Sequence, residues 1–299
     1  MDVMYITTNI ILFFLGGVIA SFVMCLADRY GVKTMMGRSV CDDCGMPLAY
    51  GSLIPFFGAF CMCKYCHKKG GVTYLFFEII FSITFLIIGN SIMHHTEIAQ
   101  VLPYGQVIFF IIAILIISLL GFLGIFDNKH KVFPTRELLL TITISFVLFL
   151  IVVLLYSLQS ISIVNQLDNI ISYIKYVMVA VAWGIPFLLI SLFSKEKYMG
   201  YGDGLLMIAF GLIAVSVKLF KNIVDFTTYQ NIPEIMRYYF YQSITEQFLV
   251  TLLAASMIGL LWGTVHNYRV NKKITLHKQQ AIPFGPPLIL GFLLVLLCF

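Results

Sequence analysis

The chain has 299 residues, of which 60% are hydrophobic and only 11% are charged. Soluble domains average about 25% charged residues, so this composition excludes a soluble globular protein and indicates an integral membrane protein. The net charge of +5 is small and carries little information by itself. The partner that composition predicts is membrane lipid, and we expect no nucleic-acid partner.

Eight apolar runs are each long enough to approach the span of a bilayer, which takes about 20 helical residues. The predicted fold class is therefore an all-α polytopic membrane protein with about eight transmembrane helices. Fifteen of the 19 lysines and arginines lie in the connections on one side, which predicts that this side is cytoplasmic. The expected spans are 5–27, 73–93, 104–126, 138–158, 174–194, 204–220, 247–267 and 282–299.

One sizeable soluble piece, residues 28–72, separates the first two spans and is too short to bury a core unaided. It contains two Cys-x-x-Cys pairs that are separated by 18 residues. Two such pairs close a tetrahedral thiolate site, which predicts a structural zinc ion. Cys61 is an alternative ligand, but Cys63 preserves the two-residue spacing. The predicted ligands are Cys41, Cys44, Cys63 and Cys66.

Two aspartates are the strongest candidates for chemistry. Asp127 follows the third span and Asp203 opens the sixth, so the topology predicts the same depth and the same side for both. A carboxylate at the edge of the hydrocarbon is costly unless it is used or paired. Two adjacent carboxylates that share one proton can activate a water and protonate a carbonyl, as in aspartic proteases. The structural alternative is a helix end at Asp127 and an N-cap at Asp203.

Three glycines flank the second aspartate in the stretch YMGYGDGLL. Because they have no side chains, they are predicted to let a substrate strand approach Asp203 closely. These candidate substrate-binding residues are Gly200, Gly202 and Gly204.

Glu78 lies inside the second span, and an intramembrane carboxylate is a functional candidate by default. We expect it to make a structural hydrogen bond, with a basic residue such as Arg38 as a further possible partner. The chain thus divides into a first transmembrane helix (1–27), a tetracysteine zinc domain (28–72) and a membrane-embedded aspartic protease domain (73–299).

Five motifs follow one another along the chain. Together they resemble those of the type IV prepilin peptidases, membrane aspartic proteases of the GxGD type, and the resemblance covers nearly the whole chain. The first motif is similar to the family's GSFLNVVIYR, and the third to an aspartate followed by Ile-Pro. The motifs are Gly16–Arg29, the cysteine pairs with Leu53-Ile54-Pro55 between them, Phe126-Asp127 followed by Phe133-Pro134, Met199–Asp203 (MGYGD), and Pro283–Pro286 (PFGP).

The resemblance implies an enzyme of the bacterial inner membrane with its active site on the cytoplasmic side. Such enzymes remove the short basic leader of type IV prepilins or pseudopilins after a glycine, for pili, type II secretion or DNA uptake. Many then methylate the new N-terminus with S-adenosylmethionine, which makes this a second candidate cofactor beside zinc. The chain departs from the family at Leu205, where a lysine is usual, and at Met24, in a region that usually holds an asparagine.

Two other functions fit parts of the sequence. An intramembrane aspartyl protease of the presenilin or signal-peptide-peptidase sort shares the GxGD aspartate but carries Pro-Ala-Leu where this chain has Pro-Phe-Gly-Pro. A polytopic transporter or assembly scaffold with a structural zinc loop is the non-enzymatic alternative, because intramembrane carboxylates also serve ion pathways.

Overall fold

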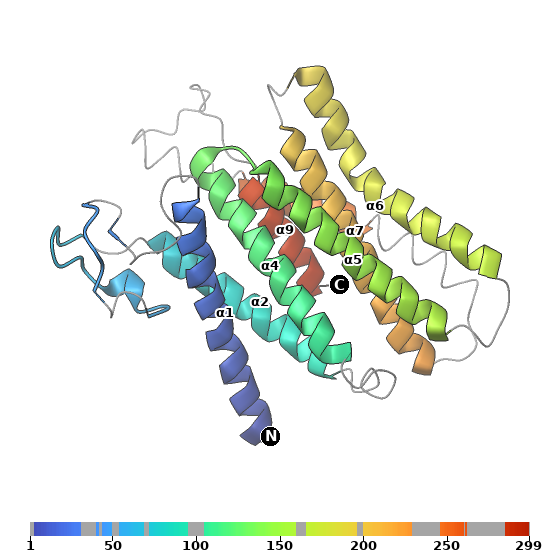
Figure 1. Ribbon diagram of the computed structural model, residues 1–299, viewed down its shortest axis with the longest axis horizontal. Coiled ribbons are helices and arrows are strands. Elements are labelled where there is room, and N and C mark those ends of the chain that lie inside the picture. Colours follow the sequence, from blue (N-terminus) through green and yellow to red (C-terminus); the bar gives the residue numbers. More distant parts are fainter. Residues whose placement is uncertain are drawn as a thin grey trace. The chain divides into compact units, whose positions relative to one another are not determined.

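The computed structural model describes residues 3–30, 40–41, 44–49, 54–68, 72–94, 105–159, 166–195, 200–228, 246–259, 261 and 285–298. Apart from isolated bridges such as Val40–Pro47, regular structure in these residues is helical, which confirms the predicted all-α fold class. The helices are α1 (Val3–Arg29), the short turn η2 (Gly58–Phe60), α2 (Val72–His94), α4 (Gly105–His130), α5 (Thr135–Gln159), α6 (Gln166–Ser194), α7 (Tyr201–Thr228), the segment Glu246–Gly259, and α9 (Gly285–Cys298) (Figure 1).

Five of these helices are long and apolar enough to cross a membrane, and three further apolar stretches are shorter. The long ones cover Ile6–Arg29, Phe110–His130, Thr135–Leu154, Tyr173–Ser194 and Tyr201–Leu219. The helices extend beyond most of the predicted spans because apolar runs mark only the hydrocarbon-facing part, whereas backbone hydrogen bonding continues through flanking polar residues. The shorter stretches are Tyr74–Asn90, Glu246–Gly259 and Gly285–Val295.

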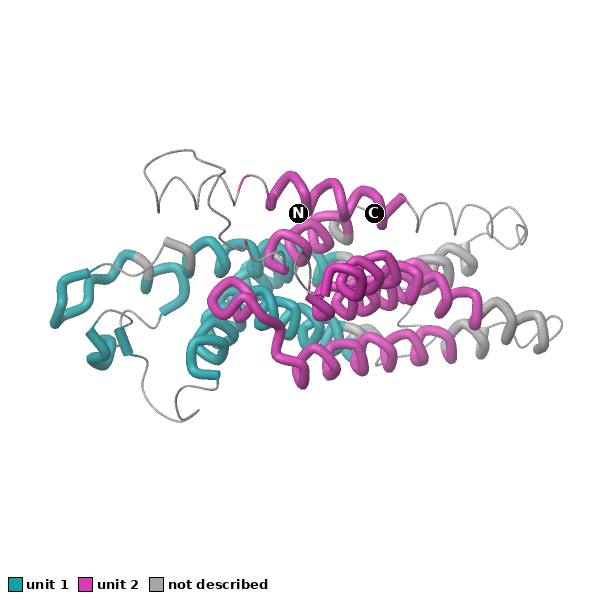
Figure 2. Tube along the Cα trace, turned by 90° about the horizontal axis from the view of Figure 1, so that it is seen from above, with its two compact units in different colours: residues 1–125 teal, residues 126–299 magenta. Residues whose placement is uncertain are grey.

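The chain forms two compact units, residues 1–125 and 126–299, which Figure 2 shows in different colours. In the first unit, α1 and α2 run antiparallel at very close range. A Cβ atom at Gly16 would lie only 2.7 Å from Cα of Ser82, so glycine is needed for this approach. The hydroxyl of Tyr74 donates to Asp28 at 2.6 Å, which ties the end of α1 to the beginning of α2. The division at 28 and 73 that the sequence suggested stays a prediction.

In the second unit, α7 packs against both α5 and α6 (Figure 1). Small residues again set the distance between the helices, here α7 and α6, because a Cβ atom at Gly211 would lie 2.8 Å from Cα of Ala180. On another side of α7, the ring of Phe210 stacks on Phe292 of α9 with centroids 4.0 Å apart. This packing fixes where the first residues of α7 and α9 lie, and both helix ends carry candidate site residues.

Candidate functional site

Asp127 lies in the last turn of α4 and is buried, with 5% of its surface exposed. Its Oδ2 accepts a hydrogen bond of 3.0 Å from the backbone N–H of Gly285, the first residue of α9. Helix N-termini carry partial positive charge, so the beginning of α9 is a favourable place for a carboxylate. Asp127 is therefore held by a residue 158 positions further along the chain.

Asp203 lies in the first turn of α7 and is also buried, with 8% exposed. Its Oδ2 accepts a hydrogen bond of 3.2 Å from the N–H of Gly200, which precedes the helix. This is the reciprocal half of a capping box, in which an acidic residue at the third helical position bonds back to the cap. Asp203 thus stabilises the start of its helix from the third helical position and not as the N-cap of the structural alternative, and the same bond fixes the direction of its carboxylate.

The two aspartates are brought together within the second unit. The ring of Phe133 joins their surroundings, since it lies 2.6 Å from a Cβ atom built at Gly202 and also meets one built at Gly285. One aromatic ring therefore contacts the glycine before Asp203 and the glycine that binds Asp127.

The three glycines around Asp203 have different surroundings. Phe133 fills the space beside Gly202, and Leu188 of α6 lies 2.6 Å from a Cβ atom built at Gly204. A Cβ at Gly200 would have no described neighbour closer than 3.9 Å. Of the three, Gly200 has the least crowded surroundings among the described residues.

Glu78, in α2 of the first unit, is buried with 6% exposed. Its Oε2 accepts a hydrogen bond of 2.6 Å from the backbone N–H of Phe56, in the segment between the two cysteine pairs. Phe56 has a left-handed backbone (φ 67°), which is uncommon for a residue with a side chain. The expected structural hydrogen bond is therefore present, while Arg38 lies outside the described residues.

The two cysteine pairs sit on loops of the same design. In the first, the N–H of Cys41 donates to the carbonyl of Met46, and the N–H of Gly45 donates back to Cys41. The second loop repeats this pattern. The N–H of Cys63 donates to Lys68, and the N–H of His67 donates back to Cys63. Gly45 and His67, the equivalent residues, both have left-handed backbones (φ 69° and 57°).

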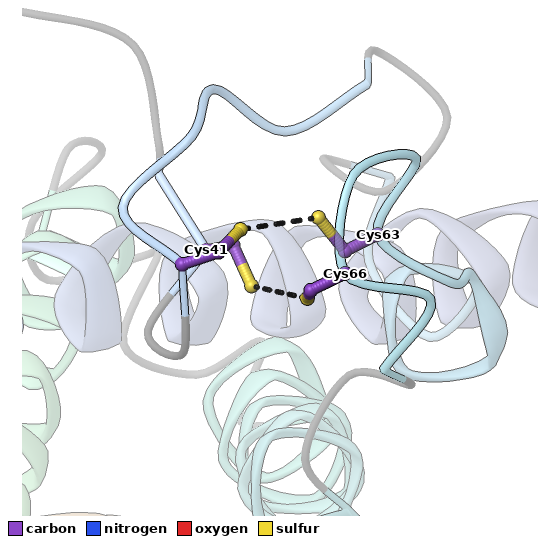
Figure 3. Close-up of side chains that lie close together, drawn as sticks. Cys41, Cys63 and Cys66 are labelled. Carbon is purple, nitrogen blue, oxygen red and sulfur yellow. Dashed lines mark hydrogen bonds between the residues drawn. The ribbon is translucent and has the colours of Figure 1, made fainter.

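The four thiols of Cys41, Cys44, Cys63 and Cys66 face one another across the two loops, as the labelled cysteines in Figure 3 illustrate, and their sulfur atoms all lie within 4.8 Å. The closest pairs are Cys41–Cys66 at 3.6 Å and Cys44–Cys63 at 3.7 Å. A tetrahedron with zinc–sulfur bonds of about 2.3 Å has edges of about 3.8 Å, so the cluster has the right size for a metal ion. Backbone N–H groups of Cys66 and Tyr65 lower the pKa of the Cys63 thiol to about 6, whereas burial and the neighbouring thiols raise the pKa of Cys44 to about 12 and also raise the pKa of Cys66, so Cys63 ionises before these two.

The arrangement distinguishes Cys63 from Cys61. Cys63 occupies the position that Cys41 has in the other loop, whereas Cys61 lies outside the cluster of four. The predicted ligand set is consistent with structural zinc. Phe133 and Gly285 belong to motifs that the sequence singled out, but sequence reasoning gave neither of them a role beside the aspartates. The prolines at 286 and 287 mark the beginning of a helix there, but no sequence signal pairs Gly285 with Asp127.

Comparison with protein-family models finds a match to part of the chain. Residues 14–92 match the bacterial Peptidase A24 N-terminal domain, a family model consistent with a type IV prepilin peptidase. The match includes the four clustered cysteines and Glu78 and ends before Asp127. No curated protein and no solved structure matches the chain significantly. The similarity therefore concerns the part of the chain that holds α1, the cysteine loops and most of α2.

Proposed function

We propose, from the premise that residues 14–92 carry the bacterial Peptidase A24 N-terminal domain, that this protein is a membrane aspartic endopeptidase acting on type IV prepilins or pseudopilins. The observation that carries the proposal is that Asp127 and Asp203 are both buried and border the same ring, because Phe133 lies against Gly202, which precedes Asp203, and against Gly285, which binds Asp127. Each carboxylate is held by a backbone N–H at the beginning of a helix, so both have fixed directions.

The chemistry follows from two carboxyl groups that share one proton. The ionised carboxylate takes a proton from water, and the resulting nucleophile attacks the scissile carbonyl, whose oxygen receives the proton of the other carboxyl group. The C–N bond of the tetrahedral intermediate then breaks as the first carboxyl group passes the water proton to the amine nitrogen and the second carboxylate takes a proton from the diol, so the pair again holds one proton. Burial keeps bulk water away from the pair, which strengthens these electrostatic effects.

The substrate must be unwound at the scissile bond, because a helical carbonyl is already hydrogen-bonded and shielded. The less crowded space at Gly200 is where we place the extended stretch that carries the leader. The excess of lysine and arginine on one side supports a cytoplasmic location for this site in the bacterial inner membrane. We propose that the four cysteines hold zinc as a structural ion, since four thiolates leave no open position for water.

Mass spectrometry of a co-expressed type IV prepilin tests the proposal. We expect the pilin to lose its basic leader, leaving a new N-terminus after a glycine. Cleavage within the apolar span of the pilin would favour the other class of intramembrane aspartyl protease, and an intact leader would contradict the proposal. The same spectrum reports N-methylation by S-adenosylmethionine, a prediction that rests on the family resemblance alone.

We expect Gly285→Ala to lower the cleavage rate by about 10²-fold, because misplacing a catalytic group by about 1 Å has an effect of that size. The added methyl group would lie 2.6 Å from Oδ2 of Asp127 and would also collide with Phe133. The matched control is Gly259→Ala, whose methyl group meets Pro287 at an ordinary 3.7 Å. Equal initial rates of leader removal by the two variants would show that the position of Asp127 does not depend on Gly285.

A further inference from the structure

The segment Ile54–Phe60, with the sequence IPFFGAF, is apolar throughout, although it belongs to the connection between α1 and α2. Several of its side chains are largely exposed. Ile54, Phe57 and Phe60 expose 53%, 64% and 69% of their surfaces. A small connecting loop in water would not be expected to present three large apolar side chains so openly. The exposure therefore calls for an apolar partner.

The position of this segment along α1 points to the partner. The ring of Phe56 stacks on Phe13, with centroids 5.4 Å apart, and meets Phe14 edge-on at 6.1 Å. It also lies against Gly17, which precedes the end of α1 at Arg29 by 12 residues. At 1.5 Å per residue, this contact lies about 18 Å from that end. The segment thus runs alongside the helix (Figure 1) and not beyond it.

That distance is comparable with the thickness of one leaflet. The hydrocarbon core is about 30 Å thick, so one leaflet accounts for about 15 Å. The segment Ile6–Arg29 is one of the helices able to cross a membrane. A residue that packs beside Gly17 therefore lies at hydrocarbon depth, even if the last turn of α1 protrudes into the headgroups.

The exposed surface of the segment continues the exposed side of α1. Phe14 is 53% exposed while it contacts Phe56, and Val18 and Phe22, further along the same helix, are 52% and 65% exposed. These side chains belong to a membrane-spanning helix, so lipid is their natural neighbour. The same lipid would cover Phe57 and Phe60 without any additional binding partner.

The backbone of the segment is suited to a place without water. Irregular backbone at membrane depth is tolerated only where its polar groups are satisfied internally. The N–H of Phe56 donates to the buried carboxylate of Glu78. Of the next five N–H groups, those of residues 57, 58, 60 and 61 donate to carbonyls of the segment, and Pro55 has no N–H to satisfy. The internal bonds are Phe57 to Pro55, Gly58 to Ile54, Phe60 to Phe57, and Cys61 to Gly58.

The residues that follow are basic and exposed. Lys64 and Lys68 lie on the second cysteine loop, immediately after the apolar segment. Lysines close to a membrane surface are attracted to anionic headgroups. The order along the chain is therefore an apolar insertion followed by a basic loop, which matches the order of layers from the hydrocarbon to the headgroups.

We infer that residues 54–60 form a re-entrant loop inserted into the lipid leaflet nearest the end of α1, anchored there by the hydrogen bond from Phe56 to Glu78. The exposed side chains of the loop contact the acyl chains of that leaflet, and the second cysteine loop lies at the headgroups. The insertion holds the cysteine cluster against the membrane surface. It requires only that α1 spans the bilayer and does not depend on the proposed peptidase activity.

Tryptophan fluorescence in lipid nanodiscs tests the insertion. In Phe57→Trp and Phe60→Trp, we expect the added emission to be blue-shifted and to lose about half of its intensity when the lipids carry brominated acyl chains, because indole and bromine share one layer. Aqueous acrylamide should quench it weakly. The matched control is Lys64→Trp, which should be quenched by acrylamide and little affected by the bromines. The signal of the parent protein, with its two tryptophans, is subtracted.

Two results would overturn the inference. If acrylamide quenched the indoles introduced by Phe57→Trp and Phe60→Trp to the extent seen in Lys64→Trp, the segment would lie in water. Insensitivity to both quenchers would mean that protein covers it, for instance the apolar helix of a substrate. These variants replace exposed side chains, so circular dichroism and a single elution peak suffice to confirm that the protein is folded.

The anchoring role of Glu78 is tested in the Phe57→Trp background. Glu78→Gln keeps an oxygen that accepts from Phe56, and we expect the bromine quenching to stay unchanged. Glu78→Leu leaves that N–H without an acceptor at hydrocarbon depth, and we expect the indole to become accessible to acrylamide. Unchanged quenching in the leucine variant would contradict the anchor.

Discussion

Replacing either Asp127 or Asp203 by asparagine is expected to abolish leader removal, with a loss of rate of about 10²–10⁴-fold or more. An amide can neither take the proton from water nor donate one as a carboxylic acid does. The fold should survive, because the asparagine oxygen can still accept the hydrogen bond from Gly285 or from Gly200. The measurement is the initial rate of prepilin cleavage by purified protein.

The matched control is Asp28→Asn, which makes the same chemical change at a carboxylate that accepts from Tyr74 in the other compact unit. We expect this variant to cleave at a rate near that of the parent. Because the two aspartates act as one unit, the double variant should be no slower than the slower single variant. Cleavage by either single variant at the parental rate would remove that aspartate from the mechanism.

The helices were predictable from the sequence because apolar runs of bilayer length have few alternatives to a helix in lipid. The exact ends of the helices were harder to predict. The predicted sixth span begins at residue 204, whereas α7 begins at Tyr201 and includes Asp203 in its first turn. The reason is local: the N–H of Gly200 bonds to the carboxylate of Asp203, and glycine-rich stretches otherwise read as loops.

The candidate site residues also include some that could be predicted from the sequence and some that could not. The cysteine ligands could be predicted because their spacing is local, and each loop repeats one hydrogen-bonding pattern around its own cysteines. The contact of Gly285 with Asp127 could not, since it depends on how α9 packs on α7 through Phe210 and Phe292. The wedge of Phe133 between two glycines is likewise a product of tertiary packing, for which hydrophobicity alone gives no signal.

The partner of Glu78 is a third instance. An acidic residue within a span was recognisable as unusual, and a basic partner was a reasonable expectation. The structure gives it the backbone N–H of Phe56, and Arg38 lies outside the described residues. That pairing depends on an irregular segment folding back along α1, which no periodicity in IPFFGAF announces. Sequence reasoning thus found the residues that carry unusual chemistry more readily than the neighbours that hold them.

Replacing Cys63 by serine is expected to remove most of the bound zinc and to unfold the cysteine loops, whereas Cys61→Ser should retain about one zinc per chain. The two cysteines are two residues apart, but only Cys63 belongs to the cluster of four sulfur atoms. Structural zinc contributes roughly 10–16 kcal/mol of apparent binding free energy in small domains. Its loss should therefore unfold the cysteine loops, because residues 28–72 are too few to bury a hydrophobic core. Metal-to-protein ratios from mass spectrometry, together with limited proteolysis of the connection between α1 and α2, measure both effects.

This comparison also separates a structural ion from a catalytic one. If zinc only holds the two loops together, metal loss and increased proteolysis should occur together in the same variants, because four thiolate ligands leave no position for water or substrate. Loss of zinc that stopped cleavage while the loops stayed resistant to protease would indicate a catalytic metal. If Cys61→Ser lost zinc while Cys63→Ser retained it, Cys61 and not Cys63 would be the fourth ligand. The equivalent positions of Cys63 and Cys41 in the two loops argue against that result.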